Sequence, residues 1–542
     1  MGQFLNKGNK KFADFSKTKY FVDKTELINK LLEKDADEKF ICNSRARRFG
    51  KSVTADMLVA YFSKGADSRS LFEPLKCAKD RQFLDNMNRY DTIFVDIQAQ
   101  FAIAQFEKEN PTRFISRNIV RELQEEYPDI ALGGMALMNA VSRIYHETGS
   151  QFVIIFDEWD YPVRELAEGS GERSDYIELL RGLFKNSDAK EYIRLAYLTG
   201  IMPIVRKKGQ SAVNNFMEYT MTNPMDLARD IGFTEEEVYL LCKRFGVDFE
   251  QMKEWYNGYD LEGTAMYNPL SVVRAVAAKR FQQYWTVTGT YGDIDDLINK
   301  NFDGLREDII KMLSGNRIPV NVSNGKNDLQ SFRSKSEVLT ALIHLGYFAY
   351  DADTQEAYVP NKEIQEFFYQ YMEDNESDNL SRFMKVSEKI LSAVMEGDAG
   401  ETAEQIQRVH NDFVSSIEYN DENSLSCTIT IALISAFRYY YKPVRGFPCE
   451  KGFADIVYLP LPNYPNRPVI VVELKWDKGA DAAIAQIRKR QYPESLRSFS
   501  GEILLVGIDY DKKTKEHTCV IERLYAQTRA EEISSYGKKV LE

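Results

Sequence analysis

The chain has 542 residues, of which 44% are hydrophobic and 28% charged, and its formal net charge is −12. This length exceeds one ordinary hydrophobic core and predicts two to four domains, while the composition excludes disordered and collagen-like proteins. The negative charge argues against a protein that coats nucleic acid with its whole surface, and six scattered cysteines without a CxxC pair argue against a disulfide framework or a structural zinc site.

The N-terminus and the apolar stretches indicate a cytoplasmic protein without a membrane partner. The first residues, MGQFLNKGNKKF, lack the apolar core of a signal peptide. The longest apolar stretch, around residues 428–437, is too short to cross a bilayer. We therefore expect a reducing compartment in which the cysteines stay free.

Short β-rich runs alternate with helical stretches over roughly the first 200 residues, a pattern typical of a parallel sheet flanked by helices. The expected strands are residues 40–42, 92–97, 151–156 and 194–198. Several are apolar on both faces, which is typical of strands buried between two helical layers.

The segment RARRFGKS at residues 45–52 follows the first expected strand and precedes a helical pattern at 53–62. This strand–loop–helix context is the one that a phosphate-binding loop requires. Gly50 lets the backbone approach a phosphate, Lys51 neutralises its charge, and the Ser52 hydroxyl can bind Mg²⁺. We assign nucleotide binding to this loop, including the backbone of Arg48 and Phe49.

Two basic clusters stand out against the negative net charge. The first is in this loop: Arg45, Arg47, Arg48 and Lys51, with Arg45 where the usual motif has its first glycine. The second lies near the C-terminus and contains Lys475, Lys478, Arg488, Lys489, Arg490 and Arg497. Each cluster is interpreted either as a phosphate-binding patch or as a solvated surface.

Acidic and polar residues follow two later strands of the expected sheet. Asp157 and Glu158 come at the end of the strand 151–156, on the edge where open α/β sheets bind ligands. Asp157 would hold Mg²⁺, and Glu158 would orient or polarise the attacking water. Thr199, at the end of the next strand, can contact the γ-phosphate. The alternatives are a solvated acidic turn and a turn cap.

Helices dominate from about residue 223. Thr234 followed by Glu237 predicts a capping box at a helix start. The turn-rich segment 255–269 is interpreted as a connection between helices, and residues 300–375 as further helices with a short β pair near 340–351. The acidic stretch 374–379 is the best candidate for a linker.

The C-terminal part turns to strands at 453–459, 469–474 and 502–510, with a helix at 480–490 between the last two. Glu473 and Lys475 alternate on one strand and so project on the same face, and Asp455 lies in the preceding strand. Two carboxylates and a lysine suit metal-assisted phosphodiester cleavage with Mg²⁺ or Mn²⁺, with Gln486 on the following helix. The alternative is a solvated strand end with an ion pair.

The sequence resembles bacterial AAA-ATPase-like proteins that pair a P-loop domain with a C-terminal domain of the PD-(D/E)XK nuclease superfamily. The resemblance rests on the stretches YFVDKTELI, SRARRFGKS, FDEWDYP, LTGIMPI, GFTEEEV, WYNGY, KGFADIVYLP, VVELKWDKGADAAIAQI and QYPESL. That family also lacks the first P-loop glycine.

The resemblance implies ATP and Mg²⁺ roles for Lys51, Ser52, Asp157 and Glu158, and a phosphate-sensing role for Arg206. It places Asp23 and Lys24 in a motif without an assigned role. At the C-terminus it implies nuclease roles for Asp455, Glu473, Lys475 and Gln486. One departure from the family is Gly446, which stands where a glutamate is usual, with Glu450, Glu418 or Glu422 as substitutes.

The predicted fold is α/β: a P-loop NTPase parallel sheet flanked by helices at 1–222, a helical middle region at 223–380, and a restriction-endonuclease-like α/β domain at 381–542. The predicted function is ATP binding and hydrolysis coupled to metal-dependent cleavage of nucleic acid. The alternative is a nucleotide-switched regulatory protein whose C-terminal domain binds DNA or protein without cleaving. ATP, Mg²⁺ and nucleic acid are the expected ligands, and a homo-oligomer is compatible with this reading.

Overall fold

The computed structural model describes residues 2–80, 83–204, 214–286, 294, 297–298, 301–324, 332–374, 379–413, 422–449, 452–489 and 501–525. The chain forms two compact units, one of residues 1–303 and 317–367, the other of residues 304–316 and 368–542. The division of the sequence into three domains at 222 and 380 stays a prediction.

The first unit is built on a five-stranded parallel sheet with the order β2-β3-β4-β1-β5. Its strands are β1 (Phe40–Ser44), β2 (Asp91–Asp96), β3 (Phe152–Asp157), β4 (Ile193–Gly200) and β5 (Met217–Tyr219). The four strands expected from apolar runs are confirmed within two residues at each end, and the short β5 was not predicted. All side chains of β1 and β3 are buried, as expected for central parallel strands.

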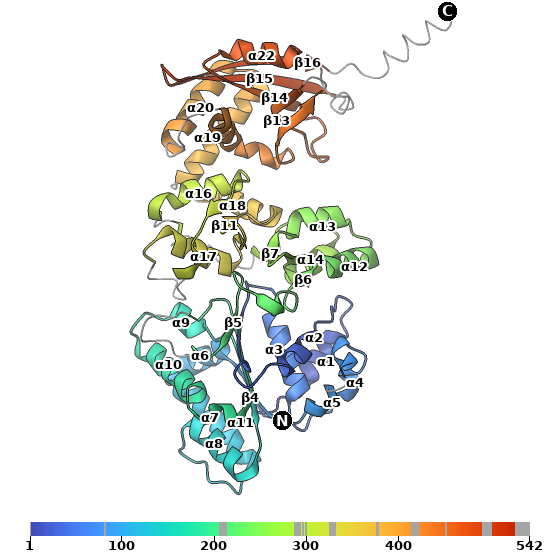
Figure 1. Ribbon diagram of the computed structural model, residues 1–542, viewed down its shortest axis with the longest axis vertical. Coiled ribbons are helices and arrows are strands. Elements are labelled where there is room, and N and C mark those ends of the chain that lie inside the picture. Colours follow the sequence, from blue (N-terminus) through green and yellow to red (C-terminus); the bar gives the residue numbers. More distant parts are fainter. Residues whose placement is uncertain are drawn as a thin grey trace, which may run out of the picture. The chain divides into compact units, whose positions relative to one another are not determined.

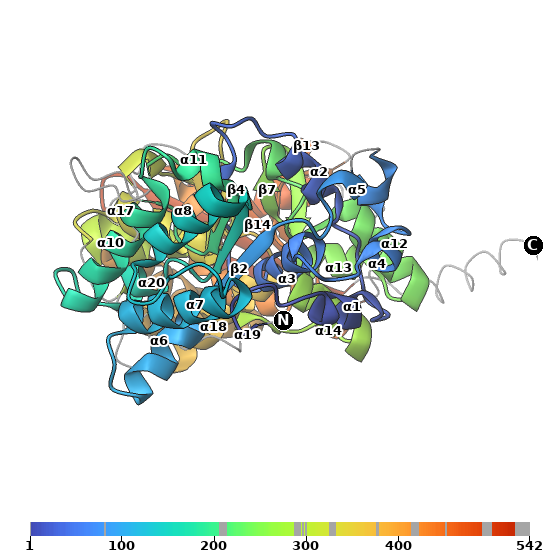
Figure 2. The same ribbon diagram turned by 90° about the horizontal axis from the view of Figure 1, so that it is seen from below.

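Alternate side chains of each strand enter two separate cores. Ile41, Val153 and Tyr197 belong to one core, whereas Cys42 and Ile154 belong to the other. Figures 1 and 2 show the matching helical layers, one of α1–α5 and one of α6–α11, on opposite sides of the sheet.

The helices of these two layers are numbered along the chain. They are α1 (Lys10–Ser16), α2 (Glu26–Leu32), α3 (Lys51–Phe62), α4 (Arg69–Phe72), η1 (Lys76–Lys79), α5 (Phe83–Asn86), α6 (Ile97–Phe106), α7 (Pro111–Glu126), α8 (Leu137–Thr148), α9 (Tyr161–Glu165), α10 (Gly171–Phe184) and α11 (Ala189–Tyr192).

The remainder of the first unit mixes helices with two small sheets. One sheet has the order β6-β8-β7, and the other β10-β11-β9. The elements are η2 (Met225–Leu227), β6 (Phe233–Thr234), α12 (Glu235–Phe245), α13 (Phe249–Tyr256), β7 (Tyr259–Leu261), β8 (Thr264–Tyr267), α14 (Pro269–Ala278), η4 (Phe302–Gly304), β9 (Ile318–Pro319), η5 (Val322–Asn324), α17 (Lys335–Leu345), β10 (Ala349–Asp351), β11 (Glu356–Tyr358) and α18 (Lys362–Asp374), whose last turns belong to the second unit.

Three expectations for this region meet different outcomes. The capping box of Thr234 and Glu237 is confirmed at the start of α12. The connection expected at 255–269 contains a β-hairpin, β7–β8, instead of turns alone. The β pair expected near 340–351 is half wrong, because residues up to Leu345 continue α17 and only β10 is a strand.

The second unit has a mixed five-stranded sheet with the order β12-β13-β14-β15-β16. Only the pair β14–β15 is parallel, and α22 lies between these two strands in the sequence. The elements are α16 (Leu305–Leu313), α19 (Asn379–Glu396), α20 (Ala399–Phe413), α21 (Glu422–Ala432), η6 (Ile434–Arg438), β12 (Val444–Cys449), β13 (Gly452–Tyr458), β14 (Val469–Trp476), α22 (Ala480–Lys489), β15 (Glu502–Asp511) and β16 (Glu516–Tyr525).

The sheet of the second unit is covered on both faces. Val469, Val471 and Leu505 form a core with Ile484 and Ile487 of α22, and α19–α21 contact β14, β15 and β16. The three predicted strands and the helix after β14 are confirmed, whereas β12 and β16 were not predicted. Of the expected linker, residues 375–378 lie outside the described residues.

Among the described residues, no helix combines the length and the apolar composition needed to cross a membrane.

Candidate functional site

The phosphate-binding loop predicted at residues 45–52 connects β1 to α3. Gly50 caps α3 with φ 96°, in the left-handed region that favours glycine. Arg48 is also left-handed, with φ 66°. These two turns bring the loop to the N-terminus of α3, whose first residue is Lys51. The N–H groups of the first helical turn are available to an anion at this position.

Arg45 does not contribute to the basic surface of the loop, and its expected place in that cluster is wrong. Its side chain is fully buried. Nη1 donates to the carbonyl oxygens of Ser44 (3.0 Å), Tyr219 (3.1 Å) and Thr220 (3.3 Å), and Nη2 donates to that of Leu227 (3.0 Å). Arg45 therefore supplies donors to carbonyls at and beyond the end of β5.

Lys51, predicted to neutralise a bound phosphate, is the first residue of α3. Its side chain is buried, and Nζ donates to the Ala46 carbonyl at 3.2 Å. Burial lowers the pKa of the Lys51 ammonium, while the carboxylates of Glu158 and Asp157 oppose this effect. An incoming phosphate would replace a neutral carbonyl as the partner of this ammonium, which is a stronger interaction.

Asp157 lies at the end of β3, next to the start of α3. Its carboxyl group is buried, and burial raises its pKa to about 6, although a hydrogen bond with Ser52 opposes the shift. The carboxylate of Asp157 and the hydroxyl of Ser52 thus lie side by side. These two hard oxygen atoms would suit Mg²⁺, which prefers such ligands.

Glu158 follows with a backbone conformation that non-glycine residues seldom adopt, φ 51°. Its carboxylate is partly exposed, with 21% of the side-chain surface accessible, and Oε2 lies 4.0 Å from Nη1 of Arg164. A left-handed glutamate costs about 1–2 kcal/mol, and such strain is found where a side chain must be aimed at a functional site.

Thr199 pairs with Asp157 across β3 and β4 and with Asn43 across β4 and β1. Its side chain is fully buried, and Oγ1 donates to the Asn43 carbonyl at 3.2 Å. A contact with the γ-phosphate would require this hydrogen bond to be exchanged, so the sensing role of Thr199 stays a prediction. Arg206, the other predicted phosphate sensor, lies outside the described residues.

The sequence analysis missed a buried ion pair beside the acidic pair. Asp160 is fully buried and accepts from Arg164 Nη1 (3.0 Å) and from the backbone N–H groups of Ile201 (3.2 Å) and Met202 (2.9 Å). The signal in the sequence was the spacing of four residues between Asp160 and Arg164, which brings their side chains together on one helical turn.

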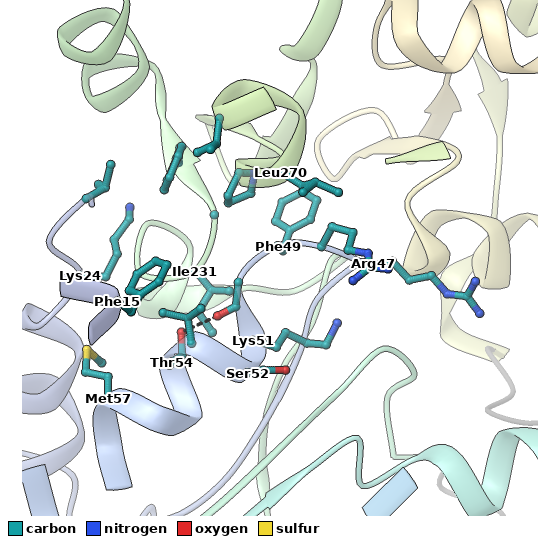
Figure 3. A pocket seen from close by; sticks show the side chains of 18 of the residues that line it. Phe15, Lys24, Arg47, Phe49, Lys51, Ser52, Thr54, Met57, Ile231 and Leu270 are labelled. Carbon is teal, nitrogen blue, oxygen red and sulfur yellow. Dashed lines mark hydrogen bonds between the residues drawn. The ribbon is translucent and has the colours of Figure 1, made fainter. Parts of the chain in front are cut away.

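Lys51, Ser52, Glu158 and Arg164 line a cavity of about 720 Å³, a size typical of small-molecule sites. Figure 3 shows Lys51 and Ser52 on one side of this cavity and Phe15, Met57 and Lys24 on the other. Apolar side chains form much of the remaining wall of the cavity: Phe15, Phe21, Val22, Met57, Ile231, Phe233, Leu270 and Val273. A polar end beside an apolar end matches the phosphates and base of a nucleotide.

Asp23 and Lys24, whose motif had no assigned role, have separate structural partners. Asp23 accepts from Thr25 N (2.9 Å) and Lys76 N (2.7 Å) and so joins α2 to η1. Lys24 lines the cavity, donates to the Arg229 carbonyl (2.7 Å) and pairs with Glu237 (2.6 Å). Lys24 therefore fixes the N-terminal segment to the residues that begin α12.

The back of the phosphate-binding loop is packed against later parts of the same unit. Asn268 donates to the Arg47 carbonyl at 3.0 Å and also caps α14. The ring of Phe49 packs edge-on against Tyr259, with centroids 5.3 Å apart. Gly346, at the end of α17, lies so close to Ala46 that a Cβ on this glycine would meet the alanine methyl at 2.8 Å.

In the second unit, the four residues predicted for the nuclease-like site come together from β13, β14 and α22. Glu473 is fully buried, and its Oε1 accepts from Gln486 and from Lys475 Nζ (3.4 Å). Lys475 also donates to the Leu474 carbonyl (2.8 Å), and Asp455 Oδ2 accepts from Leu474 N (2.8 Å). Protein donors thus satisfy oxygens of both carboxylates.

Gly446 stands at the position where a third acidic residue is expected. Gly446 lies in β12 with φ 61°, and no atom lies within 4 Å of where its Cβ would be. The substitutes Glu450 and Glu418 lie outside the described residues. Over the part of the chain that the structure describes, no group of three or more His, Cys, Asp or Glu side chains could hold a metal ion.

The second basic cluster is smaller than the sequence suggested. Lys475 is buried against Glu473, and Arg488 forms a two-pronged ion pair with Glu522 at 2.7–3.0 Å. Lys489 is exposed, and Arg490 and Arg497 lie outside the described residues. The expected phosphate-binding patch is therefore wrong for Lys475, whose charge faces a carboxylate in the interior.

Comparison with known proteins assigns the N-terminal part of the chain. Residues 7–208 match a family model described as "Predicted AAA-ATPase". A curated protein of Azotobacter chroococcum mcd 1, described as an uncharacterized protein in the vnfD 5' region, is 26% identical over 287 residues, which are 52% of this chain and 53% of that protein. The match thus spans about half of the relative's length. Residues 7–208 carry an AAA-ATPase-like domain, and they include the loop from β1 to α3 and the acidic pair after β3.

Proposed function

We propose that the first unit binds ATP with Mg²⁺ and hydrolyses it. The observation that carries the proposal is the convergence of Lys51, Ser52 and Glu158, which line the 720 Å³ cavity, with Asp157, which is hydrogen-bonded to Ser52. The match of residues 7–208 to an AAA-ATPase family model supports the same activity.

Each of these side chains has a distinct part in the reaction. Lys51 and the N–H groups of the loop hold the phosphates, and the ammonium offsets charge that builds up as the γ-phosphate leaves. Ser52 and Asp157 would hold Mg²⁺, which neutralises phosphate charge when it is bound. Glu158 accepts a hydrogen bond from the attacking water and aligns it with the γ-phosphate.

The apolar end of the cavity suits the base. Its walls come from the segment before α2, from α3, from residues 231–233 and from α14. Aromatic and aliphatic side chains such as Phe15, Ile231 and Leu270 offer apolar contacts to a purine and exclude water from it. Because four separate segments form these walls, a bound base would contact all of them at once.

The proposal is tested by calorimetry with ATP and Mg²⁺ and by phosphate release. Lys51→Ala should abolish tight binding, because it removes the ammonium that faces the phosphates. Glu158→Gln should bind ATP normally and lose on the order of 100-fold or more in turnover, because the amide keeps the shape but not the charge. The exposed Lys17→Ala is the matched control and should leave both unchanged. Equal turnover by wild type and Glu158→Gln would refute the assignment.

A second candidate activity concerns the second unit: metal-dependent cleavage of nucleic acid, with the alternative of binding without cleavage. The observation that favours a functional site is the convergence of Asp455, Glu473, Lys475 and Gln486, which come from three different elements. Buried charged groups of this kind are costly and are often retained for function. Among the residues that the structure describes, this cluster contains two carboxylates, those of Asp455 and Glu473.

A further inference from the structure

Arg164 is an arginine at the phosphate end of the cavity that no motif assigned. It lies on α9, seven residues after Asp157, and lines the cavity together with Lys51 and Glu158. Only 4% of its side-chain surface is accessible. A guanidinium at this depth faces the cavity rather than bulk solvent.

The guanidinium is held in place before any ligand arrives. Nη1 donates to Asp160 Oδ2 at 3.0 Å, and Nε donates to Glu165 Oε1 at 2.9 Å. Asp160 is itself fixed by the N–H groups of Ile201 and Met202, which follow β4. Arg164 is therefore positioned by both the strand that carries the acidic pair and the neighbouring strand.

Arg164 and Lys51 act on the same region of the cavity. The charge of Arg164 contributes to lowering the pKa of Lys51, so the two cations are close enough to repel each other. Glu158 lies between these charges: it is 4.0 Å from Arg164 Nη1, and its carboxylate counteracts the effect of burial on Lys51. A terminal phosphate bound by Lys51 beside Glu158 would bring a second anion into reach of the Arg164 fork.

We propose that Arg164 senses the γ-phosphate of ATP in its own chain: it contacts this phosphate when ATP is bound and pairs with Glu158 when the phosphate is absent. The exchange frees Glu158 to align water only when there is a γ-phosphate to attack. An arginine supplied from within the same chain is a known way to stabilise the charge of phosphoryl transfer. This inference rests on the proposed ATPase function of the same cavity.

The test compares the affinities for ATP and ADP, each with Mg²⁺, by calorimetry. Arg164→Lys keeps a charge beside Asp160 but loses the planar fork. The double variant Asp160→Asn/Arg164→Gln removes the buried pair together and leaves no lone buried carboxylate. In both variants we expect the preference for ATP over ADP to fall roughly tenfold, as for one charge-assisted hydrogen bond, with ADP affinity retained. Turnover at saturating ATP should fall on the order of 100-fold or more.

Two controls separate the outcomes. Arg143→Gln removes a surface arginine that is 42% exposed and paired with Glu147, and it should leave the ATP/ADP ratio and turnover unchanged. Glu165→Gln removes one carboxylate from Arg164 but keeps the arginine, so the ATP/ADP ratio should be kept or should rise. If both Arg164 variants bind ADP as wild type does and keep the wild-type preference for ATP, the inference is wrong. If wild type binds neither nucleotide, the proposed function itself fails.

Discussion

Arg45 has a positive charge next to the phosphate-binding glycine, but its side chain stabilises the protein interior. The sequence places it in a cluster of four basic residues beside a phosphate-binding glycine, which is interpreted either as a phosphate-binding patch or as a solvated surface. In the structure its guanidinium turns into the protein and donates to four backbone carbonyls. Composition reveals the charge of a residue but not the direction of its side chain, and that direction depends on the short β5, which had no clear signal.

This position gives a prediction about stability. Arg45→Ala should lower the free energy of unfolding by about 3–5 kcal/mol, because buried carbonyls lose their donors. Urea denaturation measures the change. Arg48→Ala, at an exposed position in the same loop, should change stability by less than about 0.5 kcal/mol. Unchanged stability of Arg45→Ala would contradict the role of the buried guanidinium.

At the nucleotide site, the sequence was most informative for residues next to apolar strands. Lys51, Ser52, Asp157 and Glu158 were found because strand ends of a parallel sheet lie on a common edge. The left-handed backbone of Glu158 could not be predicted from the sequence, because glutamate is seldom found in that conformation. Arg164 was also missed, because its spacing of four residues from Asp160 indicates an ion pair on a helix but not that this pair is buried beside the cavity.

Among the elements, the long buried strands were predictable and the short or amphipathic ones were not. β3 and β14 begin with the apolar runs FVIIF and VIVV, whereas β5 has three residues and β16 mixes charged, polar and apolar residues without a regular pattern. The hairpin β7–β8 was hidden by its turn, where Glu262 (φ 51°) and Gly263 (φ 74°) are both left-handed. This pair of angles is typical of a two-residue hairpin turn, for which Glu-Gly is a weak signal.

One acidic residue of α18 joins several elements of the first unit. Glu363 is buried and accepts from Ser271 Oγ (2.7 Å), Tyr284 N (2.6 Å) and Trp285 N (2.9 Å). These bonds tie α14 and the residues after it to the start of α18. Burial raises the pKa of the Glu363 carboxyl to about 7, although the hydrogen bonds oppose the shift.

A pH-dependent stability follows from this carboxyl group. Its pKa is about 7 in the folded state, against 4.5 for an ordinary glutamate. Its contribution to stability is therefore fully present below about pH 4.5 and is lost as the pH rises through about 7. We expect the stability of wild type relative to Glu363→Gln to fall by on the order of 2–3 kcal/mol between these pH values. The same comparison with the exposed Glu250→Gln should not vary with pH, and a constant difference for Glu363→Gln would contradict the prediction.

At the scale of the whole molecule, residues 223–303 and 317–367 share a compact unit with the parallel sheet, while the division into three domains at 222 and 380 stays a prediction. Three contacts in this unit involve the phosphate-binding loop: Asn268 with the Arg47 carbonyl, Tyr259 with Phe49, and Gly346 with Ala46. Because all three touch the phosphate-binding loop, a change in the loop on nucleotide binding would act directly on this region.

The question that remains for the whole molecule is whether the second unit binds a metal. We expect Asp455 and Glu473 to bind one Mg²⁺ or Mn²⁺ weakly, because protein donors compete for their oxygens and Gly446 stands where a third acid is expected. Gly446→Glu should tighten binding, since its Cβ would enter open space, although the left-handed backbone at φ 61° adds strain of about 1–2 kcal/mol. Calorimetry in an Asp157→Ala background, without nucleotide, removes the proposed metal ligand of the ATP site and so reports on the second unit alone.

Variants at this cluster then separate a nuclease from a binding module. Asp455→Ala or Glu473→Ala should remove metal binding and any cleavage of plasmid or single-stranded DNA. Lys475→Ala should leave the metal bound and slow cleavage, because its predicted action is on the water and the developing charge. Asp481→Asn, an exposed acid on α22, is the matched control and should change neither. If neither wild type nor Gly446→Glu takes up Mg²⁺ or Mn²⁺, the cluster serves to hold β13, β14 and α22 together, and the cleavage hypothesis is wrong.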